Sequence, residues 1–348
     1  MKTFINFLEK YNLDLKPVLV EVFDKEKKRV AEIVPIAGVM ADDYKEFLEG
    51  GKKLRGSEIF LGYQMFGGED EKQGLLGSLV IEIIHSFLLM HDDFMDEDDL
   101  RRGELTMHKK YGKVYGDHYG QSLAINLGDE GCFLAFSLLN SLDLPRERLS
   151  KATQFLGRIL FDVGIGQALD ITYENEGQFS EEKVLKVHRY KTAEYTIPGP
   201  LTLGAILAGV EDLKILQTIK NFGIPIGIAF QIRDDELGMF SSEEELGKPV
   251  DSDIKEGKLT ILIVKAMEKA KEKDLEFLKT NYGKANLNSD AVEQIRQIIK
   301  DTGALDYSQK LSRKLAEEGK KLIPEITGEP KYQQLLSELA DFVILRNS

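Results

Sequence analysis

The stretch HDDFMDEDDLRRG, from His91 to Gly103, combines residue types that bind metal ions with residue types that bind phosphate. Six of the eight positions from Asp92 to Asp99 are carboxylates, and two arginines follow directly. Asp92 and Asp96 are four residues apart, so on a helix both side chains project from one face. Two such charges about 6 Å apart repel by roughly 3 kcal/mol at an effective dielectric constant near 20. A bound divalent cation would remove this repulsion.

The residue types favour Mg²⁺ bound to a diphosphate. Carboxylates without a companion cysteine select hard ions, and Mg²⁺ keeps part of its coordination for water and substrate phosphates. The stretch does not fit an EF-hand calcium loop, because Phe94 and Leu100 fall where that loop needs oxygen ligands. Arg101 and Arg102 carry guanidinium groups, which form a fork for phosphate oxygens, although they could also pair with the neighbouring carboxylates.

Part of the acidic stretch has a simpler explanation as a solvated loop, which suits Glu97, Asp98 and Asp99. Asp92, Asp93 and Asp96 suit it less, because the segment before them is apolar nearly all round from Leu75 to Met90. Such a segment is typical of a helix buried inside a bundle.

A second apolar segment, Asn221–Asp235, also ends in an aspartate pair, Asp234 and Asp235. Pro225 and the glycines of this segment indicate a kink or a close helix approach. The sequence therefore places two acidic pairs at the ends of two buried helices.

Helical periodicity dominates the chain, and the alternation typical of half-buried strands is scarce. Segments with glycine, proline and clustered polar residues predict connections between helices. None of them is long enough to be a domain linker. These connections are Gly67–Gly74, Ser141–Glu147, Tyr173–Glu182 and Thr280–Asp290. We predict an all-α fold in which residues 1–348 form a single domain, a large bundle of about ten or more helices.

The composition narrows the classes of function. Lysine and arginine total 46 against 59 aspartates and glutamates, so a net charge of −13 argues against general affinity for nucleic acid or anionic membranes. The single cysteine, Cys132, excludes an intramolecular disulfide and suits a reducing compartment, with the cytoplasm as the default. The N-terminus lacks a signal-peptide core, and no apolar run is expected to approach membrane-spanning length, so we predict a soluble protein.

Taken in order, five motifs resemble those of the trans-isoprenyl diphosphate synthases (the polyprenyl synthetase family), and the chain resembles the archaeal-type geranylgeranyl diphosphate synthases of this family. They span about 210 of the 348 residues. The motifs are GGKKLRG (Gly50–Gly56), HDDFMDEDDLRRG, KTA (Lys191–Ala193), FQIRDDELG (Phe230–Gly238) and GKPVDSDIKEGKLT (Gly247–Thr260). The resemblance implies the isoprenoid synthase fold, a helical bundle around a central apolar cavity, and a homodimer. Apolar stretches such as Leu127–Leu139 would suit a dimer interface or the core equally well.

The resemblance also implies a role for each matching residue. The isopentenyl diphosphate site would contain Lys52, Arg55, His85 and Arg102. The Mg²⁺ ligands would be Asp92, Asp96 and Asp234. The allylic diphosphate site would contain Arg101, Lys191, Lys248 and Lys258, with Thr192 and Gln231 beside the developing cation. Asp92, Asp96, Arg101, Lys191 and Asp234 would carry the catalysis.

Some of these residues have alternative explanations. His85 in an apolar helix could be a core histidine, and Lys52 and Arg55 alone could be solvated surface charges. The second acidic motif departs from the common Asp-Asp-x-x-Asp form, because Gly238 occupies its last position. That departure resembles an archaeal variant and puts a role for the third carboxylate in doubt.

The implied reaction ionises an allylic diphosphate, adds the carbocation to isopentenyl diphosphate and removes a proton. It needs no protein nucleophile, only electrostatic stabilisation of the leaving diphosphate and exclusion of water. Phe87 and Leu88 lie five and four residues before Asp92, one to one and a half turns along the helix, where a ring could close the cavity. An aromatic residue at the fifth upstream position, a smaller one at the fourth and no insertion between the aspartates resemble archaeal-type geranylgeranyl diphosphate synthases. This resemblance implies a twenty-carbon product; Phe87 as simple core packing is the alternative.

Other functions remain open on the sequence. A farnesyl or longer-chain synthase would share every motif. A terpene cyclase would ionise the same substrate, but Lys52, Arg55 and Arg102 argue against it. An inactive regulatory subunit is disfavoured by the intact Asp92, Asp96 and Lys191. The preferred allylic starter and the downstream pathway are not predicted.

Overall fold

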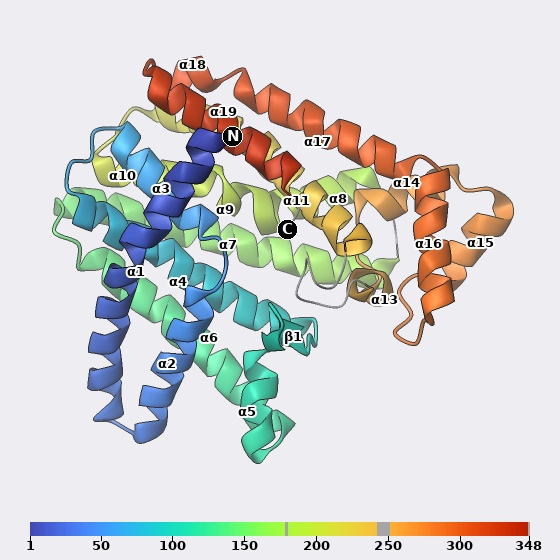
Figure 1. The fold of residues 1–348 in the computed structure, drawn as a ribbon, viewed down its shortest axis with the longest axis horizontal. Coiled ribbons are helices and arrows are strands. Elements are labelled where there is room, and N and C mark those ends of the chain that lie inside the picture. Colours follow the sequence, from blue (N-terminus) through green and yellow to red (C-terminus); the bar gives the residue numbers. More distant parts are fainter. Residues whose placement is uncertain (178–179, 242–250, 347–348) are drawn as a thin grey trace. The chain divides into compact units, whose positions relative to one another are not determined.

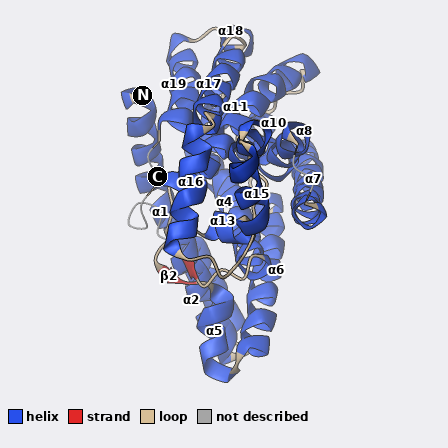
Figure 2. Ribbon diagram, turned by 90° about the vertical axis from the view of Figure 1, so that its right-hand side faces the viewer, coloured by secondary structure: helices blue, strands red, loops and turns tan. Residues whose placement is uncertain are grey.

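The computed structural model describes residues 1–177, 180–241 and 251–346, and helices dominate all three ranges (Figure 2). Within these ranges the strands are β1 (Leu100–Arg101) and β2 (Glu104–Leu105), which pair antiparallel. The predicted all-α fold is confirmed.

The chain divides into two compact units. The N-terminal unit contains Lys2–Leu156 and Pro200–Asp212; the C-terminal unit contains Met1, Gly157–Gly199 and Leu213–Ser348. The division falls inside α7 (Arg146–Glu176) and α10 (Pro198–Ala208). Whether the whole chain acts as one domain stays a prediction.

The N-terminal unit is built around α4, which packs along α6, while α1 and α2 form an antiparallel hairpin (Figure 1). Its helices, besides parts of α7 and α10, are α1 (Lys2–Ala31), α2 (Pro35–Glu49), α3 (Leu54–Met65), α4 (Glu71–Met95), α5 (Met107–Tyr115) and α6 (Asp117–Asn140). Helix α4 begins where the side chain of Asp70 accepts a hydrogen bond from the Gln73 N–H (3.1 Å), an N-cap that satisfies an otherwise unpaired donor. Its apolar side chains, such as Leu79 and Ile83, are fully buried, as the apolar run predicts.

The C-terminal unit has α11 (Leu213–Phe240) at its centre, packed against α17 and the π-helix η1. Its other elements are α8 (Glu181–Val187), η1 (His188–Ala193), α9 (Glu194–Thr196), α13 (Ser252–Glu256), α14 (Ile261–Lys269), α15 (Glu272–Asn281), α16 (Ser289–Asp301), α17 (Ala304–Lys320), α18 (Ile323–Ile326) and α19 (Pro330–Leu345). A Cβ on Gly227 of α11 would lie 2.6 Å from the Ala193 carbonyl oxygen. The close helix approach predicted from these glycines is confirmed, and α11 continues through Pro225.

Within the part of the chain that the structure describes, two helices, α4 and α6, are long and apolar enough to cross a membrane by length and composition alone. The expectation that no segment approaches this length is therefore wrong, because an average over eighteen residues tolerates an isolated charge such as Glu82. In α4, 67% of the apolar window is buried, against 33% in α6. A core helix of a soluble protein meets the same test, so the criterion is weak evidence for a membrane span.

Candidate functional site

The first acidic motif ends α4, as the sequence predicts. Asp92 lies in the last turn, and Asp96 is the C-cap residue, whose N–H donates to the Asp92 carbonyl oxygen (2.8 Å). Asp92 and Asp96 are half-buried, whereas Asp93 is fully buried. The carboxylates thus stand at the negative end of the helix dipole, where a cation is favourable.

A tight hairpin returns Arg101 to the buried member of the pair. Arg102 and Gly103 join β1 to β2 with φ of 55° and 81°, the left-handed values of a two-residue hairpin turn. Nε of Arg101 donates to Oδ1 of Asp93, and Nη2 lies 3.9 Å from Oδ2 of Asp98. Burial raises the pKa of Asp93 to about 6, although Arg101 opposes the rise. In this structure Arg101 is therefore an ion-pair partner, and its contact with an allylic diphosphate stays a prediction.

The rest of the acidic stretch is more exposed. Glu97 and Asp99 are exposed, Asp98 is half-buried, and Lys109 pairs with Asp99 at 2.8 Å. This arrangement fits a largely solvated loop.

The N-terminal unit gathers the residues assigned to isopentenyl diphosphate. Nη1 of Arg55 lies 3.2 Å from Nε2 of His85. A Cβ on Gly50 or Gly51 would lie 2.6 Å from the guanidinium nitrogens of Arg102, and Gly51 has a φ of 79°. The first two glycines of GGKKLRG therefore give Arg102 room to approach.

Lys52 follows these glycines directly and is exposed. Burial, followed by the charges of Arg55 and Arg102, lowers the pKa of His85 well below its usual value, so the imidazole stays neutral. Arg55, His85 and Arg102 come together as the resemblance implies, and Lys52 lies next to them in sequence, after Gly51. These four residues are hereafter called the basic cluster, and their role stays a prediction.

Glu82 lies among these cations, and the sequence analysis missed it. Its Oε1 accepts from the N–H of Gly56 (2.6 Å), in the first turn of α3. Burial raises its pKa, while Lys53, Arg55 and Arg102 oppose the rise. A charged residue one turn before His85 in an apolar helix was the available signal.

Phe87 and Leu88 are half-buried and lie outside the fully buried core. The Phe87 ring meets the His91 ring edge-on at 4.8 Å. A Cβ on Gly128 of α6 would lie 3.3 Å from Phe87, so the phenyl ring lies against α6. This position is compatible with the wall of a cavity.

The second acidic motif lies inside α11. As in the first motif, one aspartate is half-buried and the next is buried. Asp234 is half-buried and pairs with Nη2 of Arg346, whose guanidinium stacks 3.9 Å from the Phe230 ring centroid. Arg233 donates to the Arg346 carbonyl oxygen from Nε (3.1 Å) and Nη2 (3.0 Å). The sequence analysis missed Arg346, and nothing in the sequence indicates its pairing across more than 100 positions.

Asp235, the second residue of this pair, is buried. It accepts from Nε2 of Gln231 (2.9 Å), and its Oδ2 lies 3.1 Å from Nε2 of His188. Thr192 donates to Oε1 of Gln231 (2.8 Å). The predicted neighbours Thr192 and Gln231 are therefore in direct contact. Burial raises the pKa of Asp235, and the nearby His188 opposes this rise.

Lys191 and Thr192 belong to η1, a π-helix of the kind that often marks functional sites. A Cβ on Gly166 of α7 would lie 2.2 Å from the Lys191 backbone nitrogen, so only glycine allows this approach. Nζ of Lys191 lies 2.6 Å from Oδ2 of Asp170, which the sequence analysis also missed. The pattern Gly166-Gln167-x-x-Asp170 in an otherwise weakly charged part of α7 was the available signal.

The glycine at the last position of the second motif has a structural explanation. A Cβ on Gly238 would lie 2.2 Å from Oδ2 of Asp253, so glycine makes room for this buried carboxylate. Lys258 lies 3.2 Å from Glu256 and 3.7 Å from Asp253. Lys248 lies outside the described residues.

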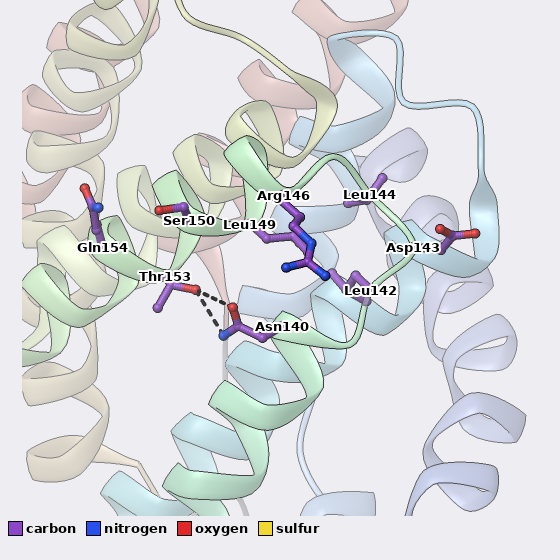
Figure 3. Close-up of a pocket in the computed structure, with 9 residues that line it drawn as sticks. All are labelled: Asn140, Leu142, Asp143, Leu144, Arg146, Leu149, Ser150, Thr153 and Gln154. Atoms are coloured by element: carbon purple, nitrogen blue, oxygen red, sulfur yellow. Dashed lines mark hydrogen bonds between the residues drawn. The ribbon is translucent and has the colours of Figure 1, made fainter.

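Among the residues that the structure describes, no three His, Cys, Asp or Glu side chains are close enough to hold a metal ion by themselves. A pocket of about 730 Å³ opens at the connection between α6 and α7, and none of the residues that line it is a predicted site residue (Figure 3). Its lining residues are Asn140, Leu142, Asp143, Leu144, Arg146, Leu149, Ser150, Thr153 and Gln154. It is an open surface pocket without the predicted chemistry, and we assign no reaction to it.

Comparisons with known proteins identify the family of this chain. The family model for polyprenyl synthetase matches residues 39–299. The chain is 35% identical over 306 residues to a geranylgeranyl diphosphate synthase of Sulfolobus acidocaldarius, covering 87% of this chain and 89% of that protein. It is 33% identical over 304 residues to a geranylfarnesyl diphosphate synthase of Aeropyrum pernix, covering 85% and 91%.

The fold is similar to the crystal structure of a geranylgeranyl pyrophosphate synthase from Corynebacterium glutamicum complexed with isoprenyl diphosphate and magnesium. The TM-score is 0.89 at 28% sequence identity, over 97% of this chain and 99% of that chain.

Proposed function

Because this chain belongs to the polyprenyl synthetase family of trans-prenyltransferases, we propose that it condenses isopentenyl diphosphate with allylic diphosphates to give mainly geranylgeranyl diphosphate. The allylic substrates would be dimethylallyl, geranyl and farnesyl diphosphate. The observation that carries this proposal is the basic cluster, where Arg55 and His85 meet and Arg102 lies on Gly50 and Gly51. A terpene cyclase has no second diphosphate that would need such a cluster.

In this proposal the basic cluster binds the diphosphate of isopentenyl diphosphate. Arg55 and Arg102 supply permanent positive charge, and neutral His85 supplies a ring nitrogen for hydrogen bonding. Buried Glu82 balances the cations before substrate arrives and holds the start of α3 through the Gly56 N–H.

The donor set of both acidic motifs fits Mg²⁺. Asp92, Asp96 and Asp234 present hard oxygen ligands from half-buried positions, and Asp234 already attracts a cation, the guanidinium of Arg346. Few protein ligands per ion suit Mg²⁺, which takes the others from substrate phosphates and water. When bound, Mg²⁺ supplies positive charge that stabilises the departing diphosphate.

The chain's own residues would perform the remaining work. As the allylic carbon–oxygen bond breaks, Arg101, Lys191, Lys248 and Lys258 would stabilise the negative charge that grows on the diphosphate. Thr192 and Gln231 would lie beside the allylic cation, and apolar walls would exclude water. The double bond of isopentenyl diphosphate then attacks the cation, and loss of a proton completes the product.

A purified assay tests the function directly. With dimethylallyl diphosphate, isopentenyl diphosphate and Mg²⁺, we expect geranylgeranyl diphosphate as the main product by mass analysis, and none after chelation with EDTA. Hydrocarbon formed from geranylgeranyl diphosphate alone would indicate a cyclase. A chain that is inert in this assay but alters the output of an active synthase would indicate a regulatory subunit.

Phe87 tests the product length, on which the relatives disagree. If its ring closes the cavity, Phe87→Leu and then Phe87→Ala should give progressively longer products, because each change removes part of the floor. Leu89→Ala is a matched control, since Leu89 projects about 200° around the same helix. Products no longer than those of the parent would leave Phe87 as core packing.

We also propose a homodimer in the cytoplasm. Phe133 of α6 is 70% exposed, and Ile125 is exposed on the same helix, an apolar surface that a second copy could cover. Phe133→Glu should lower the mass measured by light scattering from that of a dimer to that of a monomer. A parent chain that is monomeric at micromolar concentration would contradict the dimer.

A further inference from the structure

Four side chains of the C-terminal unit form a continuous polar chain: His188, Asp235, Gln231 and Thr192. Their contacts are 3.1 Å from His188 Nε2 to Asp235 Oδ2, 2.9 Å from Gln231 Nε2 to Asp235 Oδ1, and 2.8 Å from Thr192 Oγ1 to Gln231 Oε1. His188, Asp235 and Thr192 are buried, and Gln231 is half-buried. Because water has little access, these contacts decide how each group is oriented.

The direction of the hydrogen bonds in this chain follows from donor chemistry. Gln231 donates from Nε2 to Oδ1 of Asp235, so its NH₂ group is turned toward the carboxyl group. Its oxygen then faces Thr192, and the Thr192 hydroxyl must donate its one proton to that oxygen. The hydroxyl therefore has only lone pairs left for any other neighbour, and a lone pair is the favourable partner for a positive charge.

We propose that His188 is a positioning residue that holds this chain in one direction, so that Thr192 presents lone pairs to the allylic cation. The inference rests on the proposed function. Nε2 of His188 lies 3.1 Å from Oδ2 of Asp235, the carboxylate oxygen that does not accept from Gln231, at ion-pair distance. Without it, Asp235 can rotate away from Gln231, the amide can flip, and Thr192 can turn its proton toward the substrate.

Binding of two unreactive analogues of the allylic diphosphate separates this role from simple packing. One analogue carries an ammonium nitrogen at the position of the cation; the other is a thiolodiphosphate with a neutral hydrocarbon. We expect His188→Leu to weaken the ammonium analogue about tenfold and to leave the thiolodiphosphate within about twofold, since only the first carries the positive charge. Calorimetry with Mg²⁺ present measures both affinities.

Two further variants sharpen the test. His188→Gln retains a nitrogen donor at nearly the same reach and should recover most of the lost affinity. Thr192→Val removes the hydroxyl and should produce the same selective loss as His188→Leu, and the double variant should lose little more than either one alone. His108→Leu, which replaces another buried histidine outside this chain, is the matched control and should not change the ratio of the two affinities.

Each outcome decides a separate question. A parent chain that binds neither analogue would contradict the proposed function. If the parent binds both and His188→Leu weakens them equally, or leaves both unchanged, the positioning role of His188 is wrong while the proposed function stands.

Discussion

The two aspartate pairs have the same sequence and lie on two apolar helices. In both pairs the two carboxylates differ in burial in the same way. In each pair the first carboxylate, Asp92 or Asp234, is half-buried. The second, Asp93 or Asp235, is buried and has a partner from another element. A repeated dipeptide thus supplies one half-buried carboxylate, which we propose binds a metal ion, and one buried carboxylate.

The two buried carboxylates differ in how their charge is balanced. Asp93 pairs with Arg101, eight residues further along the chain, which the hairpin of β1 and β2 brings back. Asp235 depends on His188 in η1, 47 residues earlier, and on Gln231, one turn before it. The first pair is therefore a local structure built around a permanent cation, and the second depends on packing between distant segments.

The largest expected effect comes from the half-buried members. Asp92→Asn and Asp234→Asn should each lower kcat/KM at least about a thousandfold, because each removes charge that holds a metal ion against the leaving group. Titration with Mn²⁺ followed by electron paramagnetic resonance should show weaker metal binding in both. Asp99→Asn, in the exposed part of the loop, is the control and should stay within about twofold. Full turnover in either variant would break the proposed equivalence of the two pairs.

The buried member of the first pair predicts a large effect on stability. Arg101→Met leaves Asp93 buried without its counter-charge and should cost about 3–5 kcal/mol of unfolding free energy. Adding Asp93→Asn should recover most of this loss, because the buried charge is then gone. Arg29→Met, which breaks an exposed pair with Glu26, should change stability by less than about 0.5 kcal/mol. Urea unfolding measures all three, and an additive double variant would argue against a specific pair.

Arg346 makes the second motif different from the first, because its guanidinium already forms an ion pair with Asp234. Arg346→Gln should lower the Mn²⁺ concentration needed for half-saturation about three- to tenfold, because the metal no longer competes with a guanidinium. Arg313→Gln, an exposed arginine on α17, should leave it unchanged. Weaker metal binding in Arg346→Gln would show that this arginine supports the metal site instead of competing for it.

Glu58 offers a contrast to both buried aspartates. It is fully buried, and both its carboxyl oxygens lack a hydrogen-bond partner among the described residues. Burial raises its pKa well above the usual value, so its contribution to stability is complete below about pH 4.5 and is lost as the pH rises toward the folded-state pKa. Glu58→Gln should therefore gain about 1–3 kcal/mol at pH 8.

The gain from Glu58→Gln should shrink as the pH falls toward 4.5, which thermal unfolding at several pH values will show. Glu9→Gln, at an exposed position, is the control and should change stability little. A destabilised Glu58→Gln at pH 8 would mean that this carboxyl is ionised and paired in the folded protein.

Much of the fold and of the site could be predicted because the signals are local. The apolar run before Asp92 predicted α4. The separation of four residues predicted that Asp92 and Asp96 both lie at the end of this helix. The glycines of α11 predicted the close approach to Ala193. The π-helix at Lys191 was not predicted, because its extra residue per turn leaves no pattern in hydrophobic periodicity.

The residues that sequence reasoning missed share one property: their partners come from other elements. Glu82 joins α4 to the start of α3, Asp170 joins α7 to η1, and His188 joins η1 to α11. A glutamate or histidine among apolar residues indicates that some partner exists, but it does not indicate which one.

The amino-acid sequence alone determined the helical class, the order of the motifs and the residue types of the site, because periodicity and spacing are properties of neighbouring residues. Only the tertiary structure decided which aspartate of each pair faces inward, that Arg102 lies on the glycines of GGKKLRG, and that Arg346 reaches Asp234. Burial and long-range pairing depend on how helices pack, and packing is set by all the side chains at an interface together.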